Sequence, residues 1–354
     1  MTTTPPGHTT PGVSYIMPVL NEEGYVREAV ASVLAQDYAG EKEIVLALGP
    51  SQDATTRIVE EMHAADPRVR LVHNPAGKTP IGLNLAIRAT RHPVVVRVDA
   101  HSKLAPGYTR RGIQTLFRSG AADVGGLMDA QGKTPMQRAV AAAYHSPFGL
   151  GGAAYHSGAP EGPAESAYLG IFRREVFDAV GLYDESLWRA QDWELCLRIR
   201  RSGRTVWFDP ELSTVYYPRE KLADVARQSF ASGVWRGEIA RRHPEGKSRR
   251  HDVPPVALLG VGLGLGSLAA LPVARAAGAP APVRALLGLL AGVPAVYAAG
   301  VAYAAATVKT NASATDRSLM GAVLPTIHFS WALGYLRGRV VGAGVTEDRG
   351  RSQA

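Results

Sequence analysis

Residues 94–103 read VVVRVDAHSK, a short apolar run that ends in a carboxylate, Asp99, and has an imidazole, His101, two residues later. The valine-rich run is typical of a buried strand, which we expect at 94–98. Strand and helix patterns alternate before it, with strands at 13–19, 43–48 and 69–73 and helices at 23–36, 55–65 and 79–91. This βαβαβαβ order predicts an α/β fold with a mostly parallel sheet and helices on both of its faces.

Polar residues follow the ends of these strands. Right-handed crossovers bring the carboxyl ends of parallel strands to one edge of the sheet, where open α/β sheets bind ligands. The segments that reach this edge are residues 18–23, 49–53, 74–78 and 99–101. The topology therefore predicts that Asp99 and His101 belong to a ligand-binding site.

The regular pattern becomes weaker after residue 103. Residues 139–163 are rich in Gly, Ala and His and predict a mobile loop over the site. Further on, we expect order at 168–174, then a helix, a turn at 181–185 and a helix at 192–202. Residues 1–12 are polar and proline-rich, which predicts a disordered tail rather than a signal peptide. The single cysteine, Cys196, excludes an intramolecular disulfide, and we expect it in the core.

The excess positive charge lies in the last third of the chain. The formal net charge is +8; residues 241–354 hold 13 Lys and Arg against 5 Asp and Glu, and residues 1–240 hold 26 of each sign. The same last third contains two uncharged apolar runs, 18 residues at 256–273 and 24 at 285–308. Because ~20 apolar residues cross a bilayer as a helix, we expect two transmembrane helices and no nucleic-acid partner.

Basic residues set the expected orientation of these helices. The cluster before the first run consists of Arg241, Arg242, Lys247, Arg249 and Arg250. Such a cluster stays on the cytoplasmic side, which predicts a multi-pass plasma-membrane protein whose first 250 residues are cytoplasmic. A solvated run of surface charge is the alternative interpretation.

A third apolar segment, residues 319–336, carries side chains that suit a membrane interface: His328, Ser330, Trp331 and Tyr335. Four arginines follow it, and a third crossing would move them to the side opposite the first cluster. We therefore expect a re-entrant or surface-lying segment. The predicted membrane region as a whole is residues 246–354.

Seven stretches occur in the order found in one enzyme family: IMPVLNEE (16–23), SQDAT (51–55), KTPIGLNLAI (78–87), VDAH (98–101), YLGIFRREVF (168–177), GLYDES (181–186) and QDWELCLRIRRSG (191–203). With them the chain resembles the inverting family 2 glycosyltransferases of the GT-A fold. The tract RQSFASGVWR (227–236) and the apolar C-terminal region are most similar to exopolysaccharide transferases of the succinoglycan type. The resemblance implies a glycosyltransferase domain at 13–245, a nucleotide-sugar donor, a divalent metal and a hydroxyl acceptor.

The resemblance assigns Asp99 and His101 to the family's Asp-X-Asp motif, whose first Asp meets the ribose or the metal and whose second binds the metal. A histidine in the second place is a departure from the motif. Because imidazole suits Mn²⁺ better than Mg²⁺, which prefers oxygen ligands, we expect a preference for manganese. The alternative is that Asp99 only caps a helix, beside a surface His101.

Asp192 matches the second residue of the family's Glu-Asp pair, which implies that it is the general base. Gln191 replaces the glutamate, and the loss of that neighbouring charge leaves Asp192 able to take a proton. A helix N-cap is the alternative role, and the two roles are physically compatible.

The resemblance places the nucleotide on the first two loops. The implied contacts are Pro18, Asn21, Glu22, Asp53 and, for the donor diphosphate, Lys78 and Asp99. Many relatives end the second strand with two aspartates that read uracil, but Leu48 and Gly49 stand there in this chain. We still expect a UDP-sugar first, with GDP- or dTDP-sugars as alternatives. Asp53 as a turn or helix cap and Lys78 as an exposed helix-start lysine are the structural alternatives.

The acceptor is implied to lie near two further groups of residues. Gln191 and Trp193 flank the expected base, and the tract at 227–243 resembles the family's Gln/Arg/Trp segment through Gln228, Trp235 and Arg236. A basic helix lying on anionic lipid explains this tract equally well.

These observations predict a membrane-anchored inverting glycosyltransferase with a lipid-linked or polysaccharide acceptor in cell-envelope or exopolysaccharide biosynthesis. One alternative is a polyprenyl-phosphate sugar transferase, whose phosphate nucleophile needs no strong base. Another is a non-catalytic membrane scaffold with the same fold. The sequence does not specify the sugar, the acceptor or the linkage.

Overall fold

The computed structural model describes residues 10–150, 154–157, 159–246, 248–308, 312–344 and 346. Contacts between residues divide the chain into two compact units. Among the described residues, the first unit holds 10–129 and 154–216, and the second holds 130–150 and 217–346. The division therefore differs from the predicted domain boundary at residue 245. Most of the predicted tail, residues 1–9, lies outside the described residues.

The first unit is built on an eight-stranded mixed sheet in the order β3-β2-β1-β4-β7-β5-β8-β6. Its N-terminal half consists of four strands that run parallel to one another: β1 (Val13–Val19), β2 (Lys42–Leu48), β3 (Val69–His73) and β4 (Val94–Arg97). Antiparallel pairs join β7 (Ile171–Arg173) to β4 and to β5 (Asp123–Ala130), and β6 (Gly162–Pro163) to β8 (Val206–Tyr216). The predicted α/β fold with a mostly parallel sheet is confirmed.

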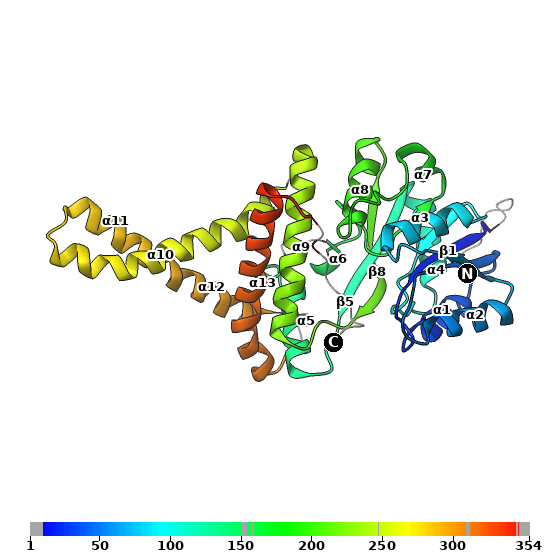
Figure 1. Ribbon diagram of the computed structural model, residues 1–354, viewed down its shortest axis with the longest axis horizontal. Coiled ribbons are helices and arrows are strands. Elements are labelled where there is room, and N and C mark those ends of the chain that lie inside the picture. Colours follow the sequence, from blue (N-terminus) through cyan, green and yellow to red (C-terminus); the bar gives the residue numbers. More distant parts are fainter. Residues whose placement is uncertain are drawn as a thin grey trace. The chain divides into compact units, whose positions relative to one another are not determined.

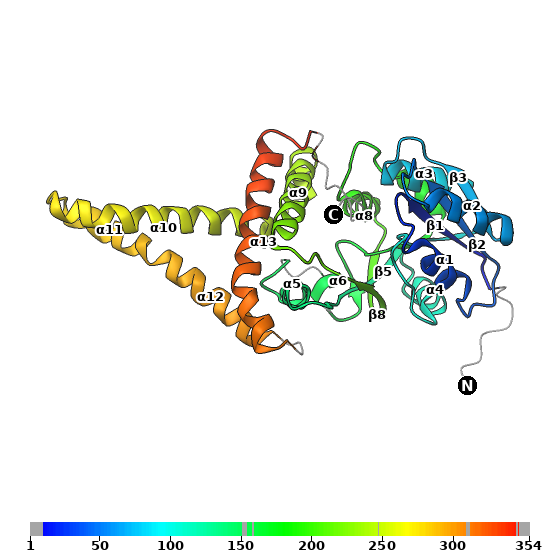
Figure 2. The ribbon, with the colours of Figure 1, turned by 60° about the horizontal axis from the view of Figure 1, so that its bottom comes forward.

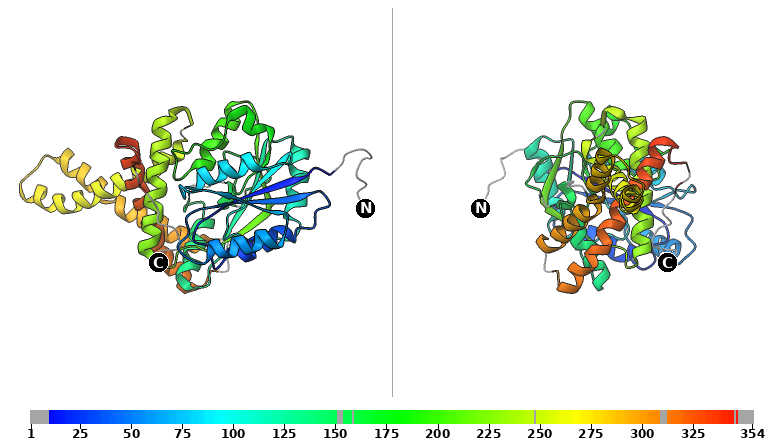
Figure 3. Two further views of the ribbon diagram at one scale, coloured as in Figure 1. Left: turned by 45° about the vertical axis from the view of Figure 1, so that its right-hand side comes forward. Right: turned by 90° about the vertical axis from the view of Figure 1, so that its left-hand side faces the viewer.

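Helices cover both faces of this sheet (Figures 1 and 3). One face packs against α1 (Val26–Leu34), α2 (Thr55–Ala65) and α4 (Tyr108–Ser119). The other face packs against α3 (Thr79–Ala89), α7 (Glu175–Val180) and α8 (Gln191–Arg201), and a short helix, α6 (Ala154–Ser157), precedes β6. The helix predicted at 23–36 is shorter than expected, because residues 23–25 form a turn.

The alternation of β4 determines where its charged residue points. Val94 and Val96 lie in the core cluster of α1 and α4, and Val95 lies in the cluster of α3 and α8. Because alternate residues of a strand share a face, Arg97 projects toward α8, on the same side as Val95. Strand alternation thus directs the guanidinium to the face of the sheet that α8 covers.

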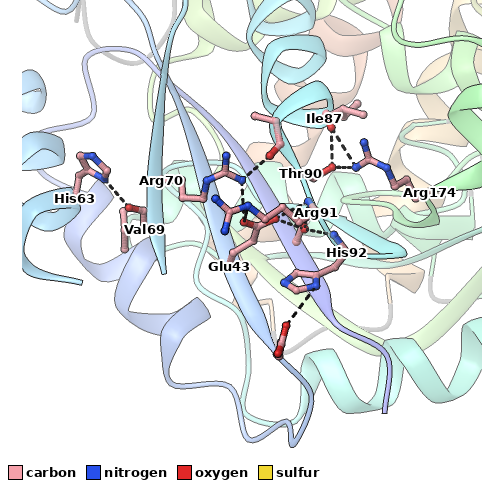
Figure 4. A network of polar contacts seen from close by, with 12 residues as sticks. Glu43, His63, Val69, Arg70, Ile87, Thr90, Arg91, His92 and Arg174 are labelled. Atoms are coloured by element: carbon pink, nitrogen blue, oxygen red, sulfur yellow. Dashed lines mark hydrogen bonds and ion pairs between the residues drawn. The ribbon is translucent and has the colours of Figure 1, made fainter. Parts of the chain in front are cut away.

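The amino-terminal edge of the sheet carries a closed network around Glu43 (Figure 4). One carboxylate oxygen accepts hydrogen bonds from the Ser14 hydroxyl at 2.6 Å and the Arg91 amide at 2.7 Å. The other accepts from Arg70 at 2.9 Å. Burial raises the pKa of Glu43, but these hydrogen bonds outweigh it and hold that pKa below its ordinary value.

The second unit is helical. Its elements are α5 (Pro135–His145), α9 (Leu222–Arg242), η1 (Pro244–Gly246), η2 (Arg249–Asp252), α10 (Val253–Ala276), α11 (Ala281–Ala291), α12 (Val293–Thr307) and α13 (Ala314–Val340). Figure 2 shows α9 and α13 side by side. Glycines allow this close approach, since a Cβ on Gly334 would lie 2.1 Å from the Phe230 carbonyl oxygen and one on Gly338 would lie 1.9 Å from that of Val234.

The mobile loop predicted at 139–163 is wrong over its first part, which belongs to α5. Thr134 and Gln137 form a capping box that starts this helix, and all the residues from Ala139 to Ala143 are buried. The alanines, which the prediction assigned to a loop, suit a buried helix because they lose no side-chain entropy there. Residues 151–153 and 158 lie outside the described part.

Three helices of the described chain are long and apolar enough to cross a membrane: Arg249–Ala276, Ala281–Thr307 and Ala314–Val340. The second contains a break at Gly292 that separates α11 from α12, next to Pro294, which cannot donate a backbone hydrogen bond. The third is one uninterrupted helix of 27 residues, begun by a capping box at Ser313. The re-entrant form predicted for residues 319–336 is therefore wrong, because a single helix runs in one direction through the whole segment.

Candidate active site

Arg97 joins two carboxylates at the carboxyl edge of the first unit. Its Nε and Nη2 donate to Oδ1 of Asp99 at 3.2 and 3.0 Å, and its Nη1 donates to Oδ1 of Asp192. The Arg97 side chain is 8% exposed, whereas those of Asp99 and Asp192 are 18% and 38% exposed. The end of β4 and the start of α8 thus meet through one buried cation.

Asp99 lies in a turn after β4. Its carbonyl oxygen accepts from the Ser102 amide at 2.8 Å, and the next helix, α4, begins only at Tyr108. The alternative that Asp99 is a helix N-cap is therefore wrong. Burial raises the pKa of the Asp99 carboxyl, but the charges of Arg97 and His101 outweigh it and hold that pKa below its ordinary value.

Asp192 is the second residue of α8 and not its cap. The helix begins at Gln191, after Ala190 in the left-handed conformation with φ 60°. The N-cap alternative is wrong because this turn directs the Asp192 side chain to Arg97 instead. A carboxylate within the first turn of a helix is also favoured by the helix dipole.

His101 faces a carboxylate of the first loop. Its Nδ1 lies 2.9 Å from Oε1 of Glu22. A metal-binding histidine usually donates its second ring N–H to a carboxylate, which orients the ring. The pair therefore fits a metal-ligating His101 that is supported by Glu22.

The donor set fits a metal ion that is held partly by substrate. The described residues contain no group of three or more His, Cys, Asp or Glu arranged as a complete metal site. Divalent metals in phosphate-transferring sites are held by one or two protein ligands, with phosphates and water completing the shell. Asp99 and His101 suit such a shell.

The first two loops are tied to each other by side chains predicted to bind the nucleotide. Oδ1 of Asn21 accepts from the Gln52 amide at 2.8 Å, and Asp53 accepts from the amides of Thr55 at 3.0 Å and Glu23 at 3.3 Å. Asp53 thus has the turn role named as its alternative, and the N-cap residue of α2 is Ala54. A direct role in nucleotide binding stays a prediction for both residues.

The remaining residues predicted to bind the donor are Pro18 and Lys78. Pro18 is in β1 and pairs with Ala47 of β2. Lys78 is the N-cap residue of α3, and its Nζ lies 4.5 Å above the ring of Trp188. The cation–π contact orients the Lys78 ammonium, so this lysine is not merely a solvated surface charge.

Gln191 and Trp193 are buried at the start of α8, at 7% and 5% exposure. Oε1 of Gln191 is buried and has no hydrogen-bond partner among the described residues.

Gln228, Trp235 and Arg236 lie on α9 of the second unit. Trp235 is 1% exposed and donates its indole N–H to the Thr346 carbonyl at 2.8 Å, so it packs inside that unit. Acceptor binding stays a prediction for all five residues.

A further buried carboxyl, Asp123 at the start of β5, contacts α8 through Cys196. The Cys196 thiol donates to its Oδ2 at 3.5 Å, and its Oδ1 has no partner among the described residues. Burial raises the pKa of Asp123 to about 8, although the Cys196 hydrogen bond lowers it and the charge of Asp192 raises it further. Cys196 is a buried free thiol, as expected.

Sequence reasoning missed Arg97 and the contact between Glu22 and His101. The signal for Arg97 was present, because a charged residue interrupts an apolar strand two positions before Asp99 and on the same side as Val95. No spacing could have predicted the partner of His101, since Glu22 is 79 residues away.

Comparisons with known proteins agree with this architecture. The family model described as glycosyl transferase family 2 matches residues 14–181. The succinoglycan biosynthesis protein ExoA of Rhizobium meliloti is 31% identical over 230 residues, which cover 64% of this chain and 70% of ExoA. The chain belongs to glycosyl transferase family 2. The family resemblance noted in the sequence is confirmed, and the protein is an enzyme that uses a nucleotide-sugar donor.

Two more distant similarities cover much of the chain. A dolichyl N-acetyl-alpha-D-glucosaminyl phosphate 3-beta-D-2,3-diacetamido-2,3-dideoxy-beta-D-glucuronosyltransferase of Methanococcus voltae is 22% identical over 65% of this glycosyltransferase and 74% of its own length. The solved structure of mannosyltransferase PcManGT from Pyrobaculum calidifontis, in complex with GDP-Man and Mn²⁺, has a TM-score of 0.60 and 19% identity. It covers 93% of this chain and 87% of PcManGT, which confirms the predicted GT-A fold.

Proposed function

We propose that this family 2 glycosyltransferase is membrane-anchored and inverting, and that its acceptor is a lipid-linked saccharide or a growing polysaccharide of the cell envelope. The observation that carries the proposal is the pairing of Asp99 and Asp192 through Arg97 at the carboxyl edge of the sheet. The names of ExoA and of the dolichyl-linked transferase support an exopolysaccharide or lipid-linked product.

Asp99 and His101 would hold the divalent metal, which supplies charge neutralisation at the donor diphosphate. The imidazole ligand favours Mn²⁺ over Mg²⁺, and the Mn²⁺ in the PcManGT complex supports this preference. A UDP-sugar remains the first expected donor. GDP-sugars are the next candidates, since PcManGT binds GDP-Man.

Asp192 would act as the general base. Its carboxylate takes the proton from the acceptor hydroxyl while the acceptor oxygen forms a bond to the anomeric carbon. The bond from that carbon to the diphosphate oxygen breaks, and its electron pair leaves with the nucleoside diphosphate. Attack opposite the leaving group inverts the anomeric configuration.

The exposed surfaces of α10 and of α11–α12 support two membrane spans. Large apolar side chains are exposed along them, at 66% for Val256, 74% for Leu289 and 74% for Val296. The basic residues next to α10 then support a cytoplasmic catalytic unit. Lys247, a member of the predicted basic cluster, lies outside the described residues.

The packing of α13 supports the prediction that this helix lies on the membrane surface. It runs alongside α9, from the contact of Gly334 with Phe230 to that of Arg339 with the Ala240 carbonyl. Helix α9 carries charges near both ends, including Arg227 at 75% and Arg241 at 50% side-chain exposure. A crossing by α13 would place one charged end of α9 in hydrocarbon, at a cost of several kcal/mol.

Cysteine accessibility tests this orientation. Ala279→Cys, in the turn between α10 and α11, should react with a membrane-impermeant maleimide from outside the cell, and Val341→Cys should react only after permeabilisation. The native Cys196 is buried and serves as the unreactive background. Labelling of Val341→Cys from outside would show that α13 crosses.

The donor and the metal are tested by calorimetry of the full chain in detergent with UDP, GDP and dTDP, each with Mn²⁺ or Mg²⁺. We expect one nucleotide to bind best with Mn²⁺, and Asp99→Asn to abolish that binding. Asp66→Asn is the matched control, since Asp66 contacts Arg68 at the end of α2. Binding of no nucleotide by the wild type would instead support a scaffold function.

The turnover of Asp192→Asn tests the alternative that the protein is a polyprenyl-phosphate sugar transferase. A phosphate nucleophile is already ionised, so Asp192→Asn should then retain nearly full turnover. A hydroxyl acceptor predicts a loss of about 10²–10⁴-fold instead.

A further inference from the structure

Arg97 is a buried cation of the first unit. The hydrogen bonds of its guanidinium go to the two carboxylates with proposed functions. Among the described residues, its guanidinium donates to Asp99 and Asp192 and to no other side chain. Burial of a guanidinium is costly unless the cation is paired. A chain that needed only stability at this place would continue the valine run of β4.

The backbone of Arg97 is fixed from both sides. Its amide donates to the Gly170 carbonyl at 3.0 Å, and on the other side it pairs with Ile16 of β1. Gly170 is closely packed, since a Cβ there would lie 2.5 Å from Oδ1 of Asp123. The guanidinium therefore extends from an anchored position.

Each carboxylate meets Arg97 through one oxygen. Arg97 contacts Oδ1 of Asp99 and Oδ1 of Asp192, and no residue in the described part of the chain hydrogen-bonds to Oδ2 of either. Both side chains are partly exposed, at 18% and 38%. The second oxygen of each carboxylate is therefore available to substrate.

We propose that Arg97 is a positioning residue. Its planar guanidinium holds Asp99 and Asp192 together and so couples the donor and acceptor sides of the site. The inference rests on the proposed roles of these carboxylates. Because one cation serves both, a change at Asp192 alters the environment of Asp99 and the reverse. Binding of the donor at Asp99 thereby sets, through Arg97, the position of the Asp192 carboxylate that takes the acceptor proton.

The coupling is tested without altering Arg97. In Asp192→Asn, Asp99 is the one remaining charged partner of the Arg97 guanidinium. We expect the guanidinium then to draw the Asp99 carboxylate away from the metal. We expect the affinity for Mn²⁺ with the best-binding nucleoside diphosphate to fall by about fivefold, although Asp192 is not a metal ligand. The Mn²⁺ electron paramagnetic resonance spectrum of the complex should also change, and neither change is expected in Asp66→Asn. Unchanged affinity and spectrum would overturn the coupling.

A second test alters the fork itself. Arg97→Lys keeps the charge, but one ammonium cannot reproduce the planar set of donors that reaches two carboxylates. Arg70→Lys is the matched control, because Arg70 pairs with the buried Glu43 at the opposite edge of the sheet. We expect Arg97→Lys to reduce kcat for Mn²⁺-dependent release of nucleoside diphosphate by about 100-fold, with the donor KM changed less than threefold. Arg70→Lys should lower the melting temperature and leave kcat unchanged.

In the Asp192→Asn background, Arg97→Lys should cost less than about fivefold in kcat, because the two residues act as a unit. Full additivity of the two losses, or unchanged kcat in Arg97→Lys alone, would overturn the positioning role. Failure of the proposed function has a different outcome, since the wild type would then bind no nucleoside diphosphate, or Asp192→Asn would keep nearly full turnover.

Discussion

Both edges of the sheet pair arginine with carboxylates, but the two arrangements differ. At the amino edge, both oxygens of Glu43 accept hydrogen bonds, from Ser14 and the Arg91 amide on one side and from Arg70 on the other. At the carboxyl edge, Asp99 and Asp192 each give one oxygen to Arg97. The first arrangement is complete within the protein, whereas in the second each carboxylate keeps one oxygen without a hydrogen bond among the described residues.

This difference indicates how function can be separated from stability in the unit. A buried carboxylate with all its hydrogen bonds made within the chain contributes to folding and leaves nothing for a ligand. A carboxylate held by one oxygen is oriented but keeps bonding capacity, which is what a preorganised site requires. Substitutions at the two edges should therefore affect different measurements.

The largest expected effect is on turnover at the carboxyl edge. Asp192→Asn should reduce transfer about 10³-fold because the acceptor hydroxyl loses its base. Its melting temperature should stay within a few degrees of the wild type, since the side chain is 38% exposed. Turnover in detergent and thermal melts of the same sample check both statements, and a loss of folding without a loss of kcat would contradict the comparison.

The next effect is on stability at the amino edge. Glu43→Gln should lower the free energy of unfolding by about 2 kcal/mol, because Arg70 loses a charged hydrogen-bond partner. The pKa of Glu43 lies below its ordinary value of 4.5, so its contribution is present above that pH and is lost as the pH falls further. Melting temperatures at pH 7 and pH 4 should show the difference between variant and wild type becoming smaller in acid. The kcat of the folded enzyme should not change.

An effect of similar size is expected on metal affinity. Glu22→Gln weakens the partner that orients His101, and loss of such a contact typically costs about 10–100-fold in metal affinity. Titration of Mn²⁺ in the presence of nucleotide measures this directly. Glu23→Gln is the control, since Glu23 accepts from the Ala54 amide and does not contact His101. Equal affinities in the two variants would remove Glu22 from the site.

The smallest effect concerns Asp123, which lies beneath α8 and has an oxygen without a partner among the described residues. Its pKa is raised to about 8 by burial, so the folded protein loses stability as the pH rises from about 4 to 8. Asp123→Asn should therefore stabilise the protein by about 1 kcal/mol at pH 8, and the gain should vanish near pH 4. Thermal melts across this range test the sign.

The sequence was most informative where local pattern decides structure. The limits of α2 and β3 agree with the predicted residues 55–65 and 69–73, because period and turn residues act over short distances. It was least informative for α5, whose alanine run is buried and whose Arg138 pairs with Asp316 of α13. The length of α13 was likewise underestimated, since packing on α9 extends it beyond its apolar centre.

The amino-acid sequence by itself determined the family, the α/β order of the first unit, the two apolar runs and the gathering of Asp99 and His101 at the ligand edge. The family follows from the resemblance of the ordered motifs, and the other features follow from periodicity and from the handedness of crossovers. Only the tertiary structure decided that Arg97 joins Asp99 to Asp192 and that Glu22 meets His101. Contacts across 79 and 95 residues depend on how strands and helices pack, and no spacing in the sequence encodes them.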